Sequence, residues 1–84
     1  MTATPITFSK LTNCDGEYEC WILRGNEAVG TLSRARPVVW GARLDLVRDR
    51  SQPWEYSAEV DGREVTIPDG STLREAKALV RSAA

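Results

Sequence analysis

The 84-residue chain has no histidine, two cysteines, and no uncharged apolar run longer than the stretch from Pro37 to Ala42. Without histidine the usual general base near neutral pH and every histidine-dependent triad are absent. Neither common glycine-rich phosphate loop occurs. These absences predict a protein that is not an enzyme, with no cofactor and no evident small-molecule substrate.

The sequence also lacks the segments that direct a protein into or across a membrane. The apolar run is far shorter than the roughly 20 residues that cross a bilayer. The first residues, MTATPITFSK, have neither the basic nor the apolar segment of a signal peptide. We therefore expect a cytoplasmic protein that does not bind membranes.

The two cysteines are predicted to be free thiols. A turn at Asp15-Gly16 would place Cys14 opposite Glu17 on the next strand. The same register places Cys20 opposite Leu11, so the two thiols are offset along the ladder and too poorly aligned to bridge. Two cysteines without histidine also offer too few ligands for zinc, and no metal site is expected.

Length and composition predict one small globular domain spanning residues 1–84. The chain is 42% hydrophobic and 27% charged, as in ordinary folded proteins. A chain of this size buries only about 60–65% of its unfolded surface. Every apolar face is therefore expected to be used.

The clearest structural pattern begins at Trp54, where apolar and polar residues alternate up to Val60, as in a strand with one apolar face. Asp61-Gly62 suits the two positive φ values of a type I′ turn. The pattern and the turn give one register, because the apolar residues of the second strand fall on the same face. The pairs in this register are Val60 with Arg63, Glu59 with Glu64, Ala58 with Val65, and Tyr56 with Ile67.

A helix is predicted after the break at Pro68-Asp69-Gly70. Thr72 can cap its first turn, and Glu75, three residues later, completes a capping box. The apolar residues that follow have helical spacing and would lie on the sheet. They are Leu73, Ala76, Leu79 and Val80.

Two strands are predicted near the start of the chain. Pro5 cannot donate to a ladder, so it suits the start of an edge strand over residues 6–9, with Ile6 and Phe8 toward the core. Residues 17–24 have apolar side chains on both faces and are expected to form a central strand. Tyr18, Cys20 and Ile22 share one face, and Trp21 and Leu23 the other.

Gly25-Asn26 predicts a type II′ turn leading to a third strand over residues 27–33. This turn sets Arg24 opposite Glu27, a favourable ion pair. It also sets Trp21 opposite Gly30, where the indole would cover bare backbone.

The middle of the chain leaves two alternatives. Residues 34–37 are expected to form a connection. Over residues 38–47, the alternation of Trp40, Ala42, Leu44 and Leu46 favours a strand, whereas Pro37 at a first helical position would suit a short helical turn. Residues 48–53 are expected to form a polar loop.

Together these elements predict an α+β fold with two layers. It is an antiparallel β-meander of five or six short strands, with one C-terminal α-helix packed on one face.

The order of strand, Val60-Asp61-Gly62 turn, strand and capped helix from Thr72 to Lys77 resembles the end of the small three-stranded DNA-binding modules of phage-type integrases. In those modules a sheet enters the major groove and a helix backs it. The resemblance covers about a third of the chain. The face that would meet DNA is lined here with Glu55, Glu59 and Glu64, so no binding residue is transferred.

Charge is segregated along the chain. The net charge is −1, but residues 34–50 carry five arginines against two aspartates, a net +3, and the segments on either side each carry −2. Trp40 lies within the positive segment, and Trp54 follows it. An arginine and indole surface suits a protein partner or a nucleic-acid backbone. The candidate partner-binding residues are Arg34, Arg36, Trp40, Arg43, Arg48 and Arg50.

Each candidate surface has a structural alternative. Arg43 and Arg48 can pair with the acidic face of the neighbouring hairpin while Trp40 and Trp54 fill the core. A basic row on the exposed side of the helix can bind phosphate or interact favourably with the helix dipole. It consists of Arg74, Lys77 and Arg81. The hairpin carboxylates can bind a divalent cation or form a solvated face.

We therefore predict a small interaction or adaptor module that docks on a protein partner, with a homodimer through an exposed strand edge as one form of such docking. The alternative is a nucleic-acid-binding accessory protein that uses the arginine-rich middle segment. Nine arginines against two lysines suggest a G+C-rich bacterial or phage genome.

Overall fold

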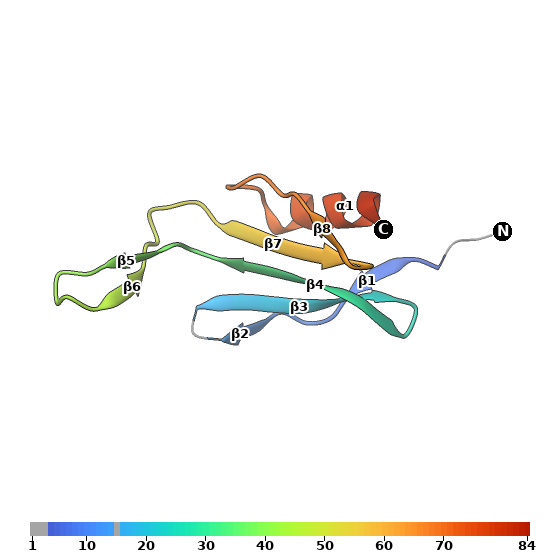
Figure 1. Cartoon of the computed structure of the whole chain (residues 1–84), viewed down its shortest axis with the longest axis horizontal. Coiled ribbons are helices and arrows are strands. Elements are labelled where there is room, and N and C mark those ends of the chain that lie inside the picture. The colour runs from blue at the N-terminus through green and yellow to red at the C-terminus, as the bar shows by residue number, and fades with distance from the viewer. Residues whose placement is uncertain (1–3, 15) are drawn as a thin grey trace.

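The structure, a computed structural model, describes residues 4–14 and 16–84, which form an antiparallel sheet covered on one face by a helix (Figure 1). This confirms the predicted α+β architecture. The strands are β1 (Ile6–Phe8), β2 (Thr12–Cys14), β3 (Glu17–Arg24), β4 (Glu27–Ala35), β5 (Val38–Trp40), β6 (Leu46–Arg48), β7 (Glu55–Val60) and β8 (Arg63–Val65), and the helix is α1 (Leu73–Ala83).

The main sheet has the order β1-β3-β4-β7-β8, with β2 also paired to β3. Strand β1 lies at the edge and β3 inside, as predicted. Cys14 lies opposite Glu17, also as predicted. The turn expected at Asp15-Gly16 includes Asp15, which lies outside the described residues.

The hairpin of β7 and β8 has the predicted register, with Ala58 opposite Val65 and Glu59 opposite Glu64. Asp61 and Gly62 have φ values of 52° and 77°, as a type I′ turn requires. The predicted pair of Tyr56 with Ile67 does not form, because the ladder ends at Val65. The Tyr56 hydroxyl instead donates to the carbonyl of Ser71 at 2.7 Å.

The pairing predicted between Trp21 and Gly30 is wrong. Arg24 does face Glu27, but its ion pair is with Asp61 instead. The register shifts between Ile22 and Leu23, so Trp21 faces Thr31. Such a shift marks a β-bulge, which adds one residue to one strand. Glycine at position 30 has another reason: a Cβ there would lie 1.8 Å from the Glu59 carbonyl oxygen on β7.

The core lies between the sheet and α1. Its sheet residues include Ile22, Leu32 and Val60, and Ala76 and Val80 meet them from the helix. The capping box is present as predicted, with the Glu75 N–H donating to Thr72 Oγ1 and the Thr72 N–H to Glu75 Oε1. Leu79, which was predicted to lie on the sheet with the other apolar residues of the helix, stays partly exposed.

Neither alternative for residues 38–47 is correct. The segment folds back on itself as a separate two-stranded sheet of β5 and β6, with a loop from Gly41 to Asp45. Within this loop the Gly41 N–H donates to the Asp45 carbonyl at 2.7 Å, and Leu44 has a φ of 59°. Strand β4 also runs two residues further than predicted, so Arg34 and Ala35 belong to the sheet.

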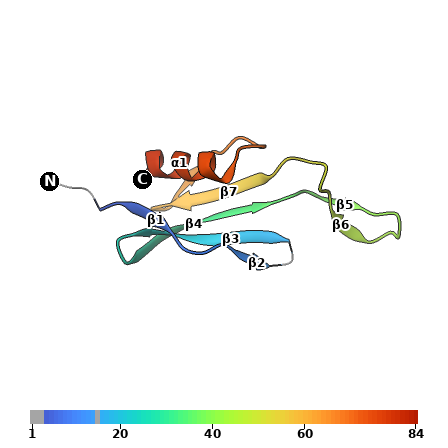
Figure 2. The ribbon, with the colours of Figure 1, turned by 180° about the vertical axis from the view of Figure 1, so that it is seen from behind.

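We call this hairpin, residues 38–48, the arm. It interrupts the meander between β4 and β7 and projects from the sheet at the end opposite the C-terminal end of α1 (Figures 1 and 2). The molecule is therefore elongated, measuring 57 × 21 × 20 Å.

Candidate functional site

The arm exposes large apolar side chains to solvent. Trp40 is 71% exposed, Leu44 84% and Leu46 62%. The interpretation that placed Trp40 in the core is therefore wrong. The other large apolar residues exposed on the arm are Val38, Val39 and Val47.

Both faces of the arm are apolar. Trp40 pairs with Leu46 and Val39 with Val47, so strand alternation puts the first pair on one face and the second pair on the other. All four side chains are exposed, so the rest of the described chain covers neither face. A two-stranded hairpin is only marginally stable by itself, so the arm depends on contacts at its base for stability.

The base of the arm is fixed by the Arg48 side chain and by a backbone hydrogen bond. The Arg48 guanidinium donates to the Arg36 carbonyl at 3.0 Å, and the Asp49 N–H donates to the Pro37 carbonyl at 2.8 Å. The Arg48 side chain also lies against Gly16, where a Cβ would be 3.2 Å from Arg48 Cγ. Arg48 therefore connects the arm to the start of β3.

Arg36 closes the loop that follows the arm. Its guanidinium donates to the carbonyl groups of Arg50 and Gln52. Ser51 donates to the Asp49 carboxylate through its hydroxyl and its N–H, and these bonds, with a smaller contribution from Arg36, lower the pKa of Asp49. The loop therefore has an internal polar framework.

A cation–aromatic cluster, formed by Tyr18, Arg34, Arg36 and Trp54, lies beside this loop. The guanidinium carbons of Arg34 and Arg36 each lie 4.4 Å from the Trp54 ring centroid. Tyr18 meets Trp54 edge to face at 5.8 Å. Each cation–π contact contributes about 0.5–2 kcal/mol, depending on how well water is excluded. Trp54 is thus held by arginines outside the hydrophobic core.

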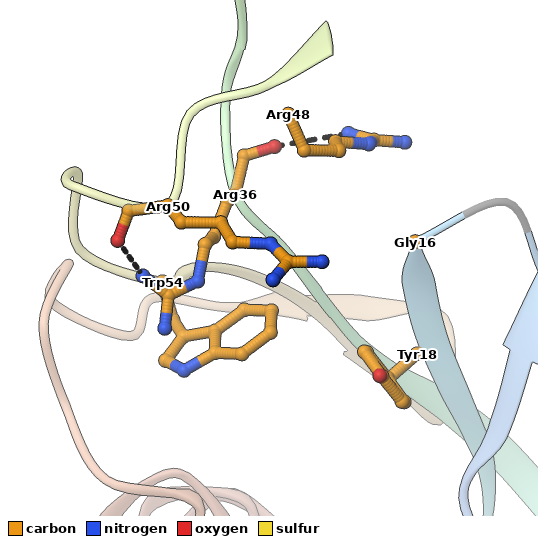
Figure 3. Close-up of a pocket in the computed structure, with 6 residues that line it drawn as sticks. All are labelled: Gly16, Tyr18, Arg36, Arg48, Arg50 and Trp54. Carbon is orange, nitrogen blue, oxygen red and sulfur yellow. Dashed lines mark hydrogen bonds between the residues drawn. The ribbon is translucent and has the colours of Figure 1, made fainter.

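An open pocket of about 390 Å³ lies between the cluster and the base of the arm (Figure 3). The Arg50 side chain has no hydrogen-bond or ion-pair partner among residues 4–14 and 16–84, and it extends over the pocket in Figure 3. The pocket can therefore receive an anionic group. Its lining residues are Gly16, Tyr18, Arg36, Arg48, Arg50 and Trp54.

The structure divides the six predicted site residues into two groups. Trp40 and Arg43 lie on the arm. The other four lie at its base, where they contact Trp54 or line the pocket: Arg34, Arg36, Arg48 and Arg50. The six predicted site residues did not include Tyr18 or the exposed aliphatic residues of the arm.

Among the described residues, the ion pairs predicted for Arg43 and Arg48 with the acidic hairpin face are not formed. The side chains of Glu55, Glu59 and Glu64 form no ion pair with any described residue. These glutamates lie on the sheet face away from α1, whereas Arg48 bonds to the Arg36 carbonyl.

Two members of the predicted basic row on α1 contact the sheet edge. Lys77 Nζ and the Arg81 guanidinium carbon lie 5.2 and 5.1 Å from the Phe8 ring centroid. Arg81 Nε also donates to the Ile6 carbonyl at 3.4 Å. These contacts favour a structural role for Lys77 and Arg81 over a phosphate-binding one.

Other chemistry gains no support from the structure. Within residues 4–14 and 16–84 no three metal-ligating side chains cluster, and no helix is long and apolar enough to span a membrane. Cys14 is an exposed free thiol and Cys20 a buried one. Burial raises the pKa of the Cys20 thiol, while nearby Lys77 opposes this effect.

Comparison with protein-family models, with curated proteins and with solved structures finds no significant match. The arm and its base are therefore the features on which a functional proposal can be built.

Proposed function

We propose that the protein is a small non-enzymatic interaction module of bacterial or phage type that docks on a protein partner through the arm. The supporting observation is the exposure of Trp40, Leu44 and Leu46 on a hairpin that projects from the sheet. An 84-residue chain has few apolar residues to spare for its core. Contiguous apolar surface kept outside such a core is typical of a binding site.

The chemistry of the arm also describes the partner. Tryptophan and arginine are the residues most enriched at the energetic centres of protein interfaces. Trp40 supplies an aromatic anchor, and Arg43 lies in the loop at the tip of the arm. The complementary partner presents an apolar surface bordered by carboxylates. Each fully buried apolar side chain would contribute about 1.5–3 kcal/mol to the gross interaction.

The test compares matched leucine substitutions on and off the arm. Leu44→Ser alters the arm, whereas Leu79→Ser makes the same change on an exposed part of α1. Tagged wild type, both leucine variants and Trp40→Ser are used to purify partners from the source organism, and a recovered protein is then purified and titrated by calorimetry. We expect Leu44→Ser and Trp40→Ser to weaken binding by about tenfold or more, and Leu79→Ser to leave it unchanged. Equal affinity of all variants would overturn the proposal.

A second candidate function is nucleic-acid binding through the base of the arm. The pocket supports it, because Arg50 has a free guanidinium among the described residues and Tyr18 and Trp54 supply aromatic rings. Arginines and aromatic rings together are typical of sites for single-stranded nucleic acid.

Fluorescence anisotropy with labelled single-stranded DNA, duplex DNA and RNA tests this function. We expect affinity that falls steeply with salt and is weakened by Arg50→Ala, with Arg74→Ala on α1 as the control. Absence of binding at low salt to all three probes would remove this candidate and leave protein docking in place.

A further inference from the structure

The sheet face opposite α1 has the chemistry that the arm requires of a partner. We call it the outer face. One row of directly paired residues crosses it over four strands: Trp21 on β3, Thr31 on β4, Glu59 on β7 and Glu64 on β8. Trp21 is 57% exposed there. The outer face therefore presents an indole beside carboxylates.

The neighbouring rows extend this arrangement. Glu19 pairs with Ser33, and Glu17 with Ala35, so the outer side of β4 carries small side chains beside glutamates of β3. Glu55 and Glu59 of β7 border β4 on its other side. A strip of small residues thus runs between two acidic strands.

No cation of the described chain pairs with the glutamates of the outer face. None of their side chains forms an ion pair or hydrogen bond with a described residue. Glu59 and Glu64 lie directly opposite each other, an arrangement that destabilises a sheet through like-charge repulsion. A cation supplied from outside the chain would relieve it. The five glutamates are Glu17, Glu19, Glu55, Glu59 and Glu64.

The arm and the segment around it carry the complementary groups. Residues 34–50 have a net charge of +3. The side chains of Arg43 and Arg50 have no ion-pair or hydrogen-bond partner in the described part of the chain. Trp40 adds an exposed indole. Apolar and basic groups on the arm and at its base thus match aromatic and acidic groups on the outer face.

We propose that the partner is a second copy of this chain, with the arm of each copy lying on the outer face of the other. This inference rests on the proposed docking function of the arm and names its partner. Two such contacts related by a two-fold axis form a closed dimer. Because the arm projects beyond the main sheet, it can reach across a second sheet without displacing the core of its own chain (Figures 1 and 2).

Charge-swapped variants test the proposal by sedimentation velocity across the micromolar to millimolar range. The arm variant carries Arg43→Glu on the arm and Arg50→Glu at its base, and the face variant carries Glu59→Lys and Glu64→Lys. We expect wild type to dimerise and each variant alone to dimerise roughly tenfold or more weakly. The control Arg74→Glu, on α1, is expected to dimerise like wild type.

An equimolar mixture of the two variants gives the sharpest result. In a mixed dimer an unaltered arm meets an unaltered face, and a reversed arm meets a reversed face. We therefore expect the mixture to recover the wild-type dimer. Circular dichroism of each variant establishes that it is folded, and Arg43→Gln and Glu59→Gln replace any variant that is not; they are expected to weaken the dimer less.

Three results would overturn the inference: a wild type that stays monomeric at millimolar concentration, a dimer insensitive to both swaps, or a mixture that fails to recover. A monomeric wild type that still loses a purified partner on Leu44→Ser would retain the docking function and exclude only the second copy as partner.

Discussion

Replacing Trp40 and Trp54 separately by alanine separates the two roles assigned to tryptophan. A fully covered tryptophan side chain buries about 200 Å², so Trp40, which is 71% exposed, has about 60 Å² covered. At about 25 cal/mol per Å² this area is worth at most about 1.5 kcal/mol. Trp40→Ala should therefore lower the free energy of unfolding by no more than that amount.

Trp54→Ala should cost more. Its ring is partly buried and lies 4.4 Å from the guanidinium carbons of Arg34 and Arg36. Truncating a packed tryptophan to alanine lowers the free energy of unfolding by about 3–5 kcal/mol. Because part of this ring is exposed, we expect a loss of about 3 kcal/mol. The total free energy of unfolding of an 84-residue protein is about 4–12 kcal/mol. Trp54→Ala thus removes a large share of the stability.

The assay is urea unfolding followed by far-UV circular dichroism, which does not depend on either indole for its signal. Both variants and wild type are measured at low micromolar concentration, so that association does not add to stability. If Trp40→Ala destabilises the chain as much as Trp54→Ala, the arm belongs to the cooperative core and the reasoning that assigns it to docking is refuted.

Three further predictions concern the sheet. Gly30→Ala should destabilise the protein by several kcal/mol or abolish folding, since its Cβ would lie 1.8 Å from the Glu59 carbonyl oxygen; a urea midpoint near that of wild type would contradict the β4–β7 packing. Asp61 forms an ion pair with Arg24 at 2.7 Å, and hydrogen bonding to this guanidinium lowers the pKa of Asp61. The stability that this ion pair contributes is present above the unfolded-state pKa of Asp61 and is lost as the pH falls through its folded-state pKa. Asp61→Asn should therefore lower the free energy of unfolding near pH 7 and match wild type in strong acid. An equal loss of stability in acid would argue against the ion pair as its cause. Alkylation of the native protein should label Cys14 and spare the buried Cys20, as mass spectrometry can show; equal labelling would contradict the burial of β3.

The parts of the fold that could be predicted are those where several local signals agree. The β7–β8 hairpin has an alternating strand, a turn of Asp61-Gly62 and a second strand that all require one register. The helix has Thr72 and Glu75 at capping-box spacing. Local sequence rules are then enough to predict these elements, because the tertiary contacts favour the same structure.

The arm could not be predicted because its turn depends on an unusual backbone. Residues 38–47 alternate as one strand would, but the chain reverses within them through a loop in which Leu44 is left-handed, with φ of 59°. Leucine rarely adopts that conformation, so the sequence contains no signal for it. The bulge near Ile22 is hidden in the same way, since one extra residue leaves the strand pattern intact.

The candidate site was predicted only in part. The clustering of arginines in residues 34–50 is visible in the sequence. The structure places four of them at the base of the arm, three lining the pocket and Arg34 against Trp54. Tyr18 joins them through the β3–β4 register, in which it faces Arg34, and that contact is not local in sequence. The alternative that placed Trp40 in the core followed the rule that apolar residues are usually buried, whereas its exposure depends on the tertiary fold.

Hydroxyl-radical footprinting of the free and the bound chain measures docking by the arm most directly. In the free protein Trp40, Leu44 and Leu46 should be oxidised readily, because each is more than half exposed. In the complex these side chains should be protected, while exposed Leu79 on α1 should react as before. Unchanged oxidation of the arm in a complex that has formed would contradict the account.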